Sequence, residues 1–72
     1  MNMPLSLARE GEPATINKVG GKEETRKFLE NLGFVTGSIV TVISQAGGSL
    51  IVNVKDARVA IGRDMANKIL VG

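Results

Sequence analysis

Residues 29–43 read LENLGFVTGSIVTVI and join a helical pattern to a strand-like pattern across two glycines. Gly33 follows Leu32, the last apolar residue at helical spacing, and so takes the C′ position of a helix that ends in a left-handed turn. Phe34 then stands at C″, where an apolar side chain commonly packs back onto the helix. The stretch predicts a sharp corner between helix and strand, with Gly37 allowing a second tight turn.

The helix that leads into this corner is predicted over residues 22–32. Apolar side chains recur there at spacings of three and four residues, which is typical of an amphipathic helix. This face consists of Thr25, Phe28, Leu29 and Leu32. Glu23 and Glu24 fall in the first turn, where the helix dipole favours negative charge. We expect Arg26 and Glu30 to pair one helical turn apart.

Strand-like segments make up most of the remaining chain. Residues 14–19 alternate between apolar and polar side chains but change phase at Val19, which predicts a bulge near Asn17 and Lys18. Residues 5–7, LSL, are expected to form a short edge strand or a lid. After the corner we expect, in order, a strand, a hairpin loop, a strand, a turn, a short strand, one helical turn and a closing strand, at residues 38–44, 45–49, 50–54, 55–58, 59–61, 62–67 and 68–71.

This order of elements predicts a mainly β fold with one helix. Five to six short strands, with the helix inserted after the first main strand, favour a small SH3-like barrel, because closure removes exposed sheet edges. The alternative is an open α+β sheet with the helix on one face. The length of 72 residues predicts a single domain over residues 1–72.

Composition argues against nucleic acid as the partner. The net charge is only +2, and the nine Lys and Arg residues are scattered along the chain. Nucleic-acid binders usually combine clustered basic residues with stacking aromatics, and aromatics make up 3% of this chain. Because small barrels often bind RNA or DNA, nucleic-acid binding remains an alternative function.

The chain contains no cysteine and no histidine. Structural zinc sites and most catalytic metal sites use these residues, so we expect neither a metal nor a cofactor in one chain. Glu23 and Glu24 are the only adjacent acidic pair, and neighbours on a helix point in different directions. A metal site built from the carboxylates of two chains, or weak self-association, remains a further alternative to a monomer.

Enzymatic activity is not expected either. The chain lacks His, Cys and Tyr, and its lysines and carboxylates form no recognisable catalytic pair. Gly20-Gly21-Lys22 lacks the upstream glycine of a phosphate-binding loop, and Glu23 stands where that loop needs Ser or Thr. No run of 18 apolar residues and no secretory signal is present, so a cytoplasmic protein without direct membrane insertion is expected.

The chain resembles FeoA, the small accessory protein of bacterial ferrous iron transport. The resemblance spans nearly the whole chain, and its most specific part is the helix that runs into Leu-Gly-Phe. The matching residues are PLSL at 4–7, GEPATI at 11–16, RKFLENLGF at 26–34, Gly37, VTV at 40–42, VAIG at 59–62, Met65, Ala66 and ILV at 69–71. Many members carry proline where Thr36 stands and a helix richer in arginine.

The resemblance implies an SH3-like barrel that associates with FeoB, the membrane transporter with a cytosolic GTP-hydrolysing domain. Similar domains also occur in iron-dependent repressors, so a repressor-type regulatory domain is the alternative. The predicted contact residues are Phe34, Val35, Arg26, Arg58 and Arg63. A loop-tip Val or Phe is a plausible contact point, although a Phe in this position is more often buried in the core and lone arginines are more often simply solvated.

Overall fold

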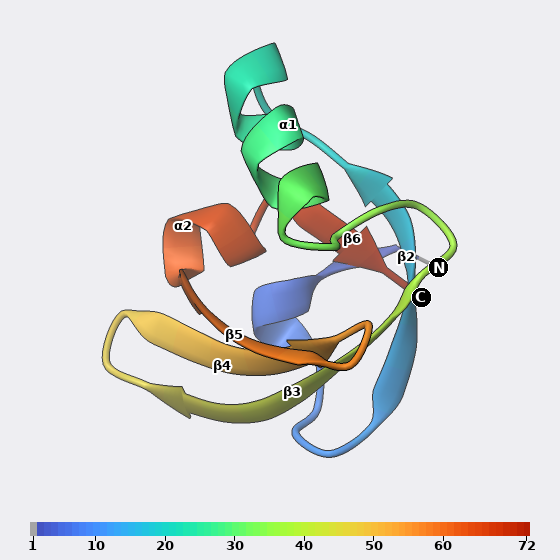
Figure 1. The fold of residues 1–72 in the computed structure, drawn as a ribbon. Helices are drawn as coiled ribbons and strands as arrows, with labels where there is room; N and C mark the ends of the chain where they lie inside the picture. Colours follow the sequence, from blue (N-terminus) through green and yellow to red (C-terminus); the bar gives the residue numbers. More distant parts are fainter. Residues whose placement is uncertain (1) are drawn as a thin grey trace.

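The computed structural model describes residues 2–72 and shows one six-stranded antiparallel sheet with strand order β1-β6-β2-β3-β4-β5. The sheet curls around a core, with α1 rising above it and α2 at one side (Figure 1). The elements are β1 (Met3–Pro4), the 3-10 helix η1 (Leu5–Leu7), β2 (Pro13–Val19), α1 (Glu23–Asn31), β3 (Ile39–Ala46), β4 (Ser49–Val54), β5 (Ala57–Gly62), α2 (Arg63–Ala66) and β6 (Ile69–Val71).

The predicted mainly β fold, with its helix after the first main strand, is confirmed. The curl does not close completely, however, because β1 and β5 stand at the two ends of the strand order. The expectation that closure would remove both exposed edges is therefore wrong. Instead, α2 joins β5 to β6 at one side of the sheet, and α1 stands above it (Figure 1).

The core is formed by alternating residues of the hairpin strands. Successive side chains of a strand point to opposite faces, so one face of β3 and β4 supplies buried valines and a leucine. Residues from every other main element complete the cluster. Its members are Leu5, Ile16, Leu29, Phe34, Val40, Val42, Leu50, Val52, Val54, Ile61, Ala66, Ile69 and Val71.

Two bulges bend the sheet. The register between β2 and β6 shifts between Ile16 and Lys18, which confirms the bulge predicted there and lets Val19 pack against the core. A second shift lies in β3 between Val42 and Ser44. The sequence pattern does not predict this second bulge. Residues 39–43 are all β-branched, and this uniform run hides the change of phase.

The hairpin turns are tighter than expected. Pairing continues to Ala46 and Ser49 in the first hairpin and to Val54 and Ala57 in the second, leaving two-residue loops. In the second loop, both Lys55 (φ 51°) and Asp56 (φ 33°) have positive φ. This is the geometry of a type I′ turn, whose twist matches that of the flanking strands.

The N-terminal leucines do not form the expected strand. Residues 5–7 form a 3-10 turn in which Leu5 is buried, whereas Leu7 is 69% exposed. Hydrogen bonds hold this turn in place, because the Ser6 hydroxyl donates to Asn67 Oδ1 and Gln45 Nε2 donates to the Ser6 carbonyl at 3.2 Å. A turn of three residues per helical turn places Leu5 and Leu7 on different sides, whereas a strand would have placed both on one face. Within residues 2–72, no helix is long and apolar enough to cross a membrane.

Candidate functional site

The corner after α1 has the predicted hydrogen-bonded geometry. Gly33 has φ 109°, its amide donates to the Glu30 carbonyl at 2.9 Å, and the Phe34 amide donates to the Leu29 carbonyl at 3.0 Å. These two bonds define a Schellman motif, which satisfies carbonyls that the helix end would otherwise leave unpaired. The helix itself ends at Asn31.

A second turn follows directly. The Ser38 amide donates to the Val35 carbonyl at 3.0 Å across Gly37, whose φ is 92°, as a type II turn requires. Two further bonds fasten this turn to β2, from Gly37 N to Ile16 O at 2.8 Å and from Ile16 N to Ser38 O at 2.9 Å. The backbone from 33 to 38 is therefore fixed at both ends.

The two predicted contact residues at this corner behave differently. Phe34 has no exposed surface and packs in the core, so a direct contact would require it to leave the core. Val35 is half-buried. The structure thus supports the core interpretation of Phe34 and leaves Val35 as the only one of the pair with surface to offer.

Next to the corner lies an open groove of about 530 Å³. One side comes from the start of β3 and the other from the end of β4 and the turn after it. The lining residues are Ser38, Ile39, Thr41, Asn53, Val54, Lys55 and Asp56. Ile39 is 53% exposed, because its neighbour Val40 takes the inward position and strand alternation turns Ile39 outward. The groove therefore combines an exposed branched side chain with charged groups at one end.

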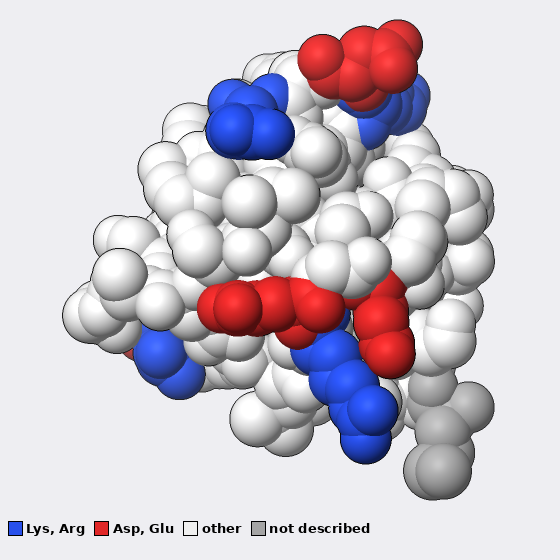
Figure 2. Space-filling model, turned by 90° about the horizontal axis from the view of Figure 1, so that it is seen from below, with Lys and Arg blue, Asp and Glu red and all other residues white. Residues whose placement is uncertain are grey.

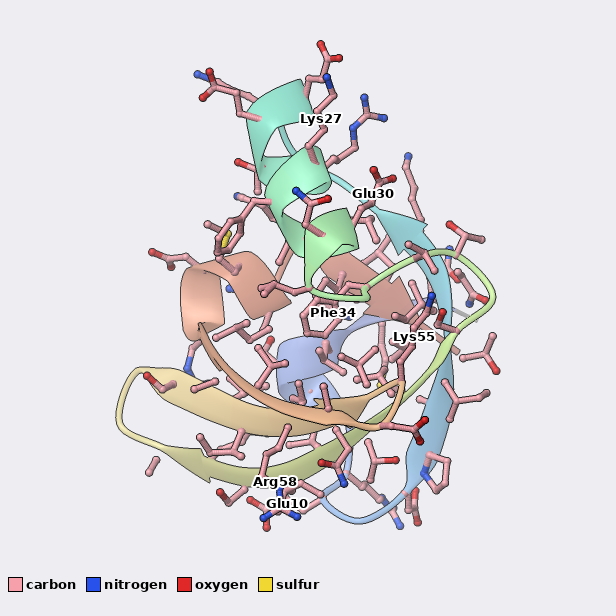
Figure 3. The ribbon with its side chains drawn as sticks, in the orientation of Figure 1. Glu10, Lys27, Glu30, Phe34, Lys55 and Arg58 are labelled. Carbon is pink, nitrogen blue, oxygen red and sulfur yellow. The ribbon has the colours of Figure 1, made fainter. Side chains whose placement is uncertain are left out.

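One predicted arginine, Arg58, does not line the groove but contacts a residue that does. Arg58 Nε donates to Oδ1 of Asn53, which lines it, at 3.4 Å. The Lys55 turn lies close to the corner, since a Cβ built on Gly33 would stand 3.7 Å from Lys55 Cδ. In Figure 3, Lys55 and Phe34 lie below the end of α1, whereas Arg58 projects on the opposite, outer side of the sheet.

The other two predicted arginines lie elsewhere. Arg63 begins α2 at the far end of β5, where its Nη2 donates to the Gly47 carbonyl at 3.4 Å. At roughly 3.3 Å per residue, the chain between Arg58 and Arg63 spans about 16 Å. Arg26 is exposed on α1. The three arginines therefore do not form one basic patch.

Helix α1 differs from its prediction on two points. Phe28, assigned to the buried face, is 51% exposed, and Leu29 is the buried residue of this helix. The helix projects from the barrel, so a side chain 100° around from Leu29 leaves the core (Figure 1). Its ion pair joins Lys27 Nζ to Glu23 Oε1 at 3.3 Å, and the expected Arg26–Glu30 pair is not formed.

The face at the bottom of Figure 1 carries no extended patch of one charge sign (Figure 2). On the face at the bottom of Figure 1, acidic and basic side chains both occur and most of the surface is uncharged (Figure 2). Within the described part of the chain, no group of three or more Asp or Glu residues is placed to hold a metal ion. The face in Figure 2 therefore shows no continuous basic stripe of the kind that follows a phosphate backbone.

None of the seven residues that line the groove is among the predicted contact residues, and three of them show why. Ile39 was assigned only to a β-branched strand, although the alternation of Val40 and Val42 already places it on the outer face. Lys55 and Asp56 were assigned to a turn without a role, and no local signal joins them to β3. Only the register of β3 against β4 brings the two sides of the groove together.

A small curled antiparallel sheet, with one helix inserted after its first main strand, defines the class of small β-barrel domains. The FeoA domain model matches residues 3–72. An Fe(2+) transport protein A from Methanocaldococcus jannaschii is 35% identical over 68 residues, covering 94% of this chain and 83% of that protein. The chain therefore belongs to the FeoA family, which is associated with ferrous iron transport.

Solved structures show the same architecture. A crystal structure of an iron uptake regulatory protein (FeoA) matches with a TM-score of 0.90 at 28% identity and covers all of this chain and 96% of that one. FeoA of Stenotrophomonas maltophilia, solved in complex with zinc and described as a prokaryotic SH3 domain protein, matches with a TM-score of 0.85 at 26% identity, covering 97% and 89% of the two chains. The fold is thus SH3-like.

The same fold forms part of a manganese-dependent transcriptional repressor. That match has a TM-score of 0.88 at 20% identity and covers 97% of this chain but 40% of the repressor. At this identity the likeness shows a shared fold alone.

Proposed function

We propose that residues 1–72 act as one non-enzymatic accessory domain of ferrous iron uptake. In this proposal the domain binds the cytosolic side of a FeoB-type transporter and modulates its conformation or assembly. Membership of the FeoA family is the observation that carries the proposal. A cytoplasmic location follows from the proposed partner surface.

The groove beside the corner supports a protein partner. Ile39 offers exposed apolar surface, and Lys55 and Arg58 offer donors for carboxylates. Val35 adjoins the groove through its turn to Ser38. An apolar residue ringed by polar groups is the usual anatomy of a small interface, where one anchor supplies much of the binding energy.

The proposed mechanism is conformational control. A barrel of this size holds no channel and no redox group, so its influence on transport must come from binding. Only a difference in affinity between two states of the transporter shifts their populations, since equal affinity shifts nothing. We therefore expect the domain to bind one nucleotide state of the transporter more tightly than the other.

The test is a titration of isotope-labelled protein with the cognate FeoB-type transporter, with and without a GTP analogue. Ile39→Ser is expected to weaken binding about tenfold or more, as loss of an interface anchor does. Leu7→Ser is the matched control, because Leu7 is 69% exposed but lies outside the groove. Equal losses from the two variants would reject the groove as the contact, and no binding by the wild-type chain would reject the proposed function.

Nucleic-acid binding is tested by titrating the same labelled protein with RNA or duplex DNA at several salt concentrations. Phosphate contacts release counterions, so such binding would weaken steeply as salt rises. The scattered arginines and the mixed charges of Figure 2 favour a protein partner instead.

A further inference from the structure

Strand β5 is a sheet edge with an unpaired backbone. It stands last in the strand order, next to β4 alone. Val54 and Ala57 close a two-residue hairpin and therefore exchange hydrogen bonds. In an antiparallel pair such exchange occurs at every second residue, so Val59 and Ile61 also bond to β4.

The residues between them point their backbone groups away from the sheet. By this alternation, the N–H and C=O groups of Arg58 and Ala60 face outward from β4. Within residues 2–72, no turn, loop or side chain supplies those groups with a partner. Both residues are exposed. The edge thus presents two donors and two acceptors in the spacing of a strand.

The two edges of the sheet differ in their protection. Strand β1 is two residues long and ends in Pro4, which has no N–H to offer. Strand β5 is six residues long, and it contains no proline and no bulge. Proteins usually protect an exposed edge by keeping it short or by placing a proline or a bulge in it, and β5 has none of these features. Ala60, small and exposed, also leaves room for another backbone to approach.

We propose that β5 receives an extended, carboxylate-bearing segment of the transporter's cytosolic side as an additional strand. Arg58 and Arg63 bracket the edge, and among the described residues neither forms an ion pair with a carboxylate. Carboxylates near the two ends of the incoming segment would meet them. Main-chain bonds supply the affinity in this mode of binding, and the flanking charges set the register. The inference rests on the proposed function, because it names how that partner binds.

A second copy of the chain fits this edge less well. Antiparallel pairing of two β5 strands about Ala60 sets Arg58 opposite Gly62 of the other copy and beside its Arg63. The same contact recurs at the other end by symmetry. Like charges would therefore meet twice, which disfavours pairing.

Amide hydrogen exchange read residue by residue tests the proposal. In the free chain we expect fast exchange at Arg58 and Ala60 and slow exchange at Val59 and Ile61, which donate to β4. Binding of the transporter should slow Arg58 and Ala60 by about tenfold or more, the equivalent of roughly 1.4 kcal/mol of protection. Binding that leaves both amides fast would overturn the inference while leaving the proposed function intact. No binding at all would overturn both.

A proline variant gives a second measurement. Ala60→Pro removes the outward N–H without removing a bond to β4, which edge strands tolerate. We expect a loss of affinity of about fivefold or more, whereas the control Ala60→Thr, which keeps the N–H, should bind within about twofold of wild type. Equal affinity of all three proteins contradicts strand addition. If Ala60→Pro fails to fold, the exchange experiment on the wild-type chain decides alone.

Self-pairing is checked in the same samples without transporter. The proposal would be overturned if protection of the Arg58 and Ala60 amides rises with the chain's own concentration and light scattering shows a doubled mass. The strand added to β5 would then come from a second copy of the chain. A concentration-independent monomer supports the proposal.

Discussion

The hairpin strands and helix α1 belong to one small domain but are held in different ways. Strands β3 and β4 place five side chains in the core, each at every second position of its strand segment. Helix α1 has nine residues and buries one of them, Leu29. The sheet is therefore fixed by packing along its length, whereas the helix is fixed by its last turn and the corner that follows.

This difference separates the residues that the fold requires from the residues that are free to contact a partner. Residues at the corner are fully engaged, since Phe34 fills the core and Gly33 sets the direction of the chain. The rest of α1, including Phe28, contributes little buried surface. We infer that substitutions at the corner act mainly on stability, while substitutions on the exposed helix and groove act mainly on binding.

Phe34→Ala provides the strongest test of this contrast. A fully buried Phe costs about 3–5 kcal/mol when truncated, while a chain of this size has a stability of roughly 4–11 kcal/mol. We expect urea denaturation, followed by circular dichroism, to show that the free energy of unfolding falls by about 3–5 kcal/mol. The matched control is Phe28→Ala on the exposed side of α1, for which we expect a loss below about 1 kcal/mol. Similar losses for the two phenylalanines would contradict the comparison.

Gly33→Ala tests the corner without touching its side-chain packing. A Cβ at this position would meet Val54 at an ordinary 3.5 Å, so the cost comes from φ 109° in the backbone. We expect a loss of about 1 kcal/mol in chemical denaturation. Gly48→Ala is the control, because nothing lies within 4 Å of its Cβ and its φ is not in the left-handed region. A loss at Gly48 as large as that at Gly33 would show that conformational strain is not the cause.

Local chemistry explains which parts of the fold were predictable. The corner was predictable because Gly33 and Phe34 carry the whole motif in two adjacent residues. The bulge at Lys18 was predictable because a change of phase at Val19 is visible in the sequence. The exposure of Phe28 was not, because periodicity identifies a face of a helix but not whether the barrel reaches far enough to cover it.

The candidate site could be predicted only in part for a related reason. Its members come from the start of β3, the end of β4 and the following turn, which are separated in sequence and joined by register. Val35 and Arg58 were singled out one at a time, and Ile39 was not recognised as exposed. The free edge of β5 likewise depends on the strand order of the whole sheet.

Asp56→Gly tests the backbone strain in the two-residue turn between β4 and β5. Asp56 adopts φ 33° at the second position of a type I′ turn, where glycine is preferred. Glycine relieves the backbone strain of the folded state, but its greater conformational entropy stabilises the unfolded chain. The first effect is slightly larger than the second, so we expect the free energy of unfolding to rise by about 0.5 kcal/mol. Thermal unfolding measures the gain, and a loss of stability would show that the Asp side chain itself supports the turn.

Glu23→Gln on α1 should have the smallest effect. The Glu23–Lys27 pair is exposed, with 70% and 69% of the two side chains accessible, and such pairs contribute at most about 0.5 kcal/mol. Because salt screens exposed charges, the difference from wild type should vanish in denaturant titrations near 1 M NaCl, where the Debye length is about 3 Å. A difference that persists there would mean that Glu23 is held by more than this pair. Since α1 is anchored at its other end, fraying of its first turn should leave the corner at Gly33 intact, and the amide of Phe34 should exchange as slowly as in the wild-type chain.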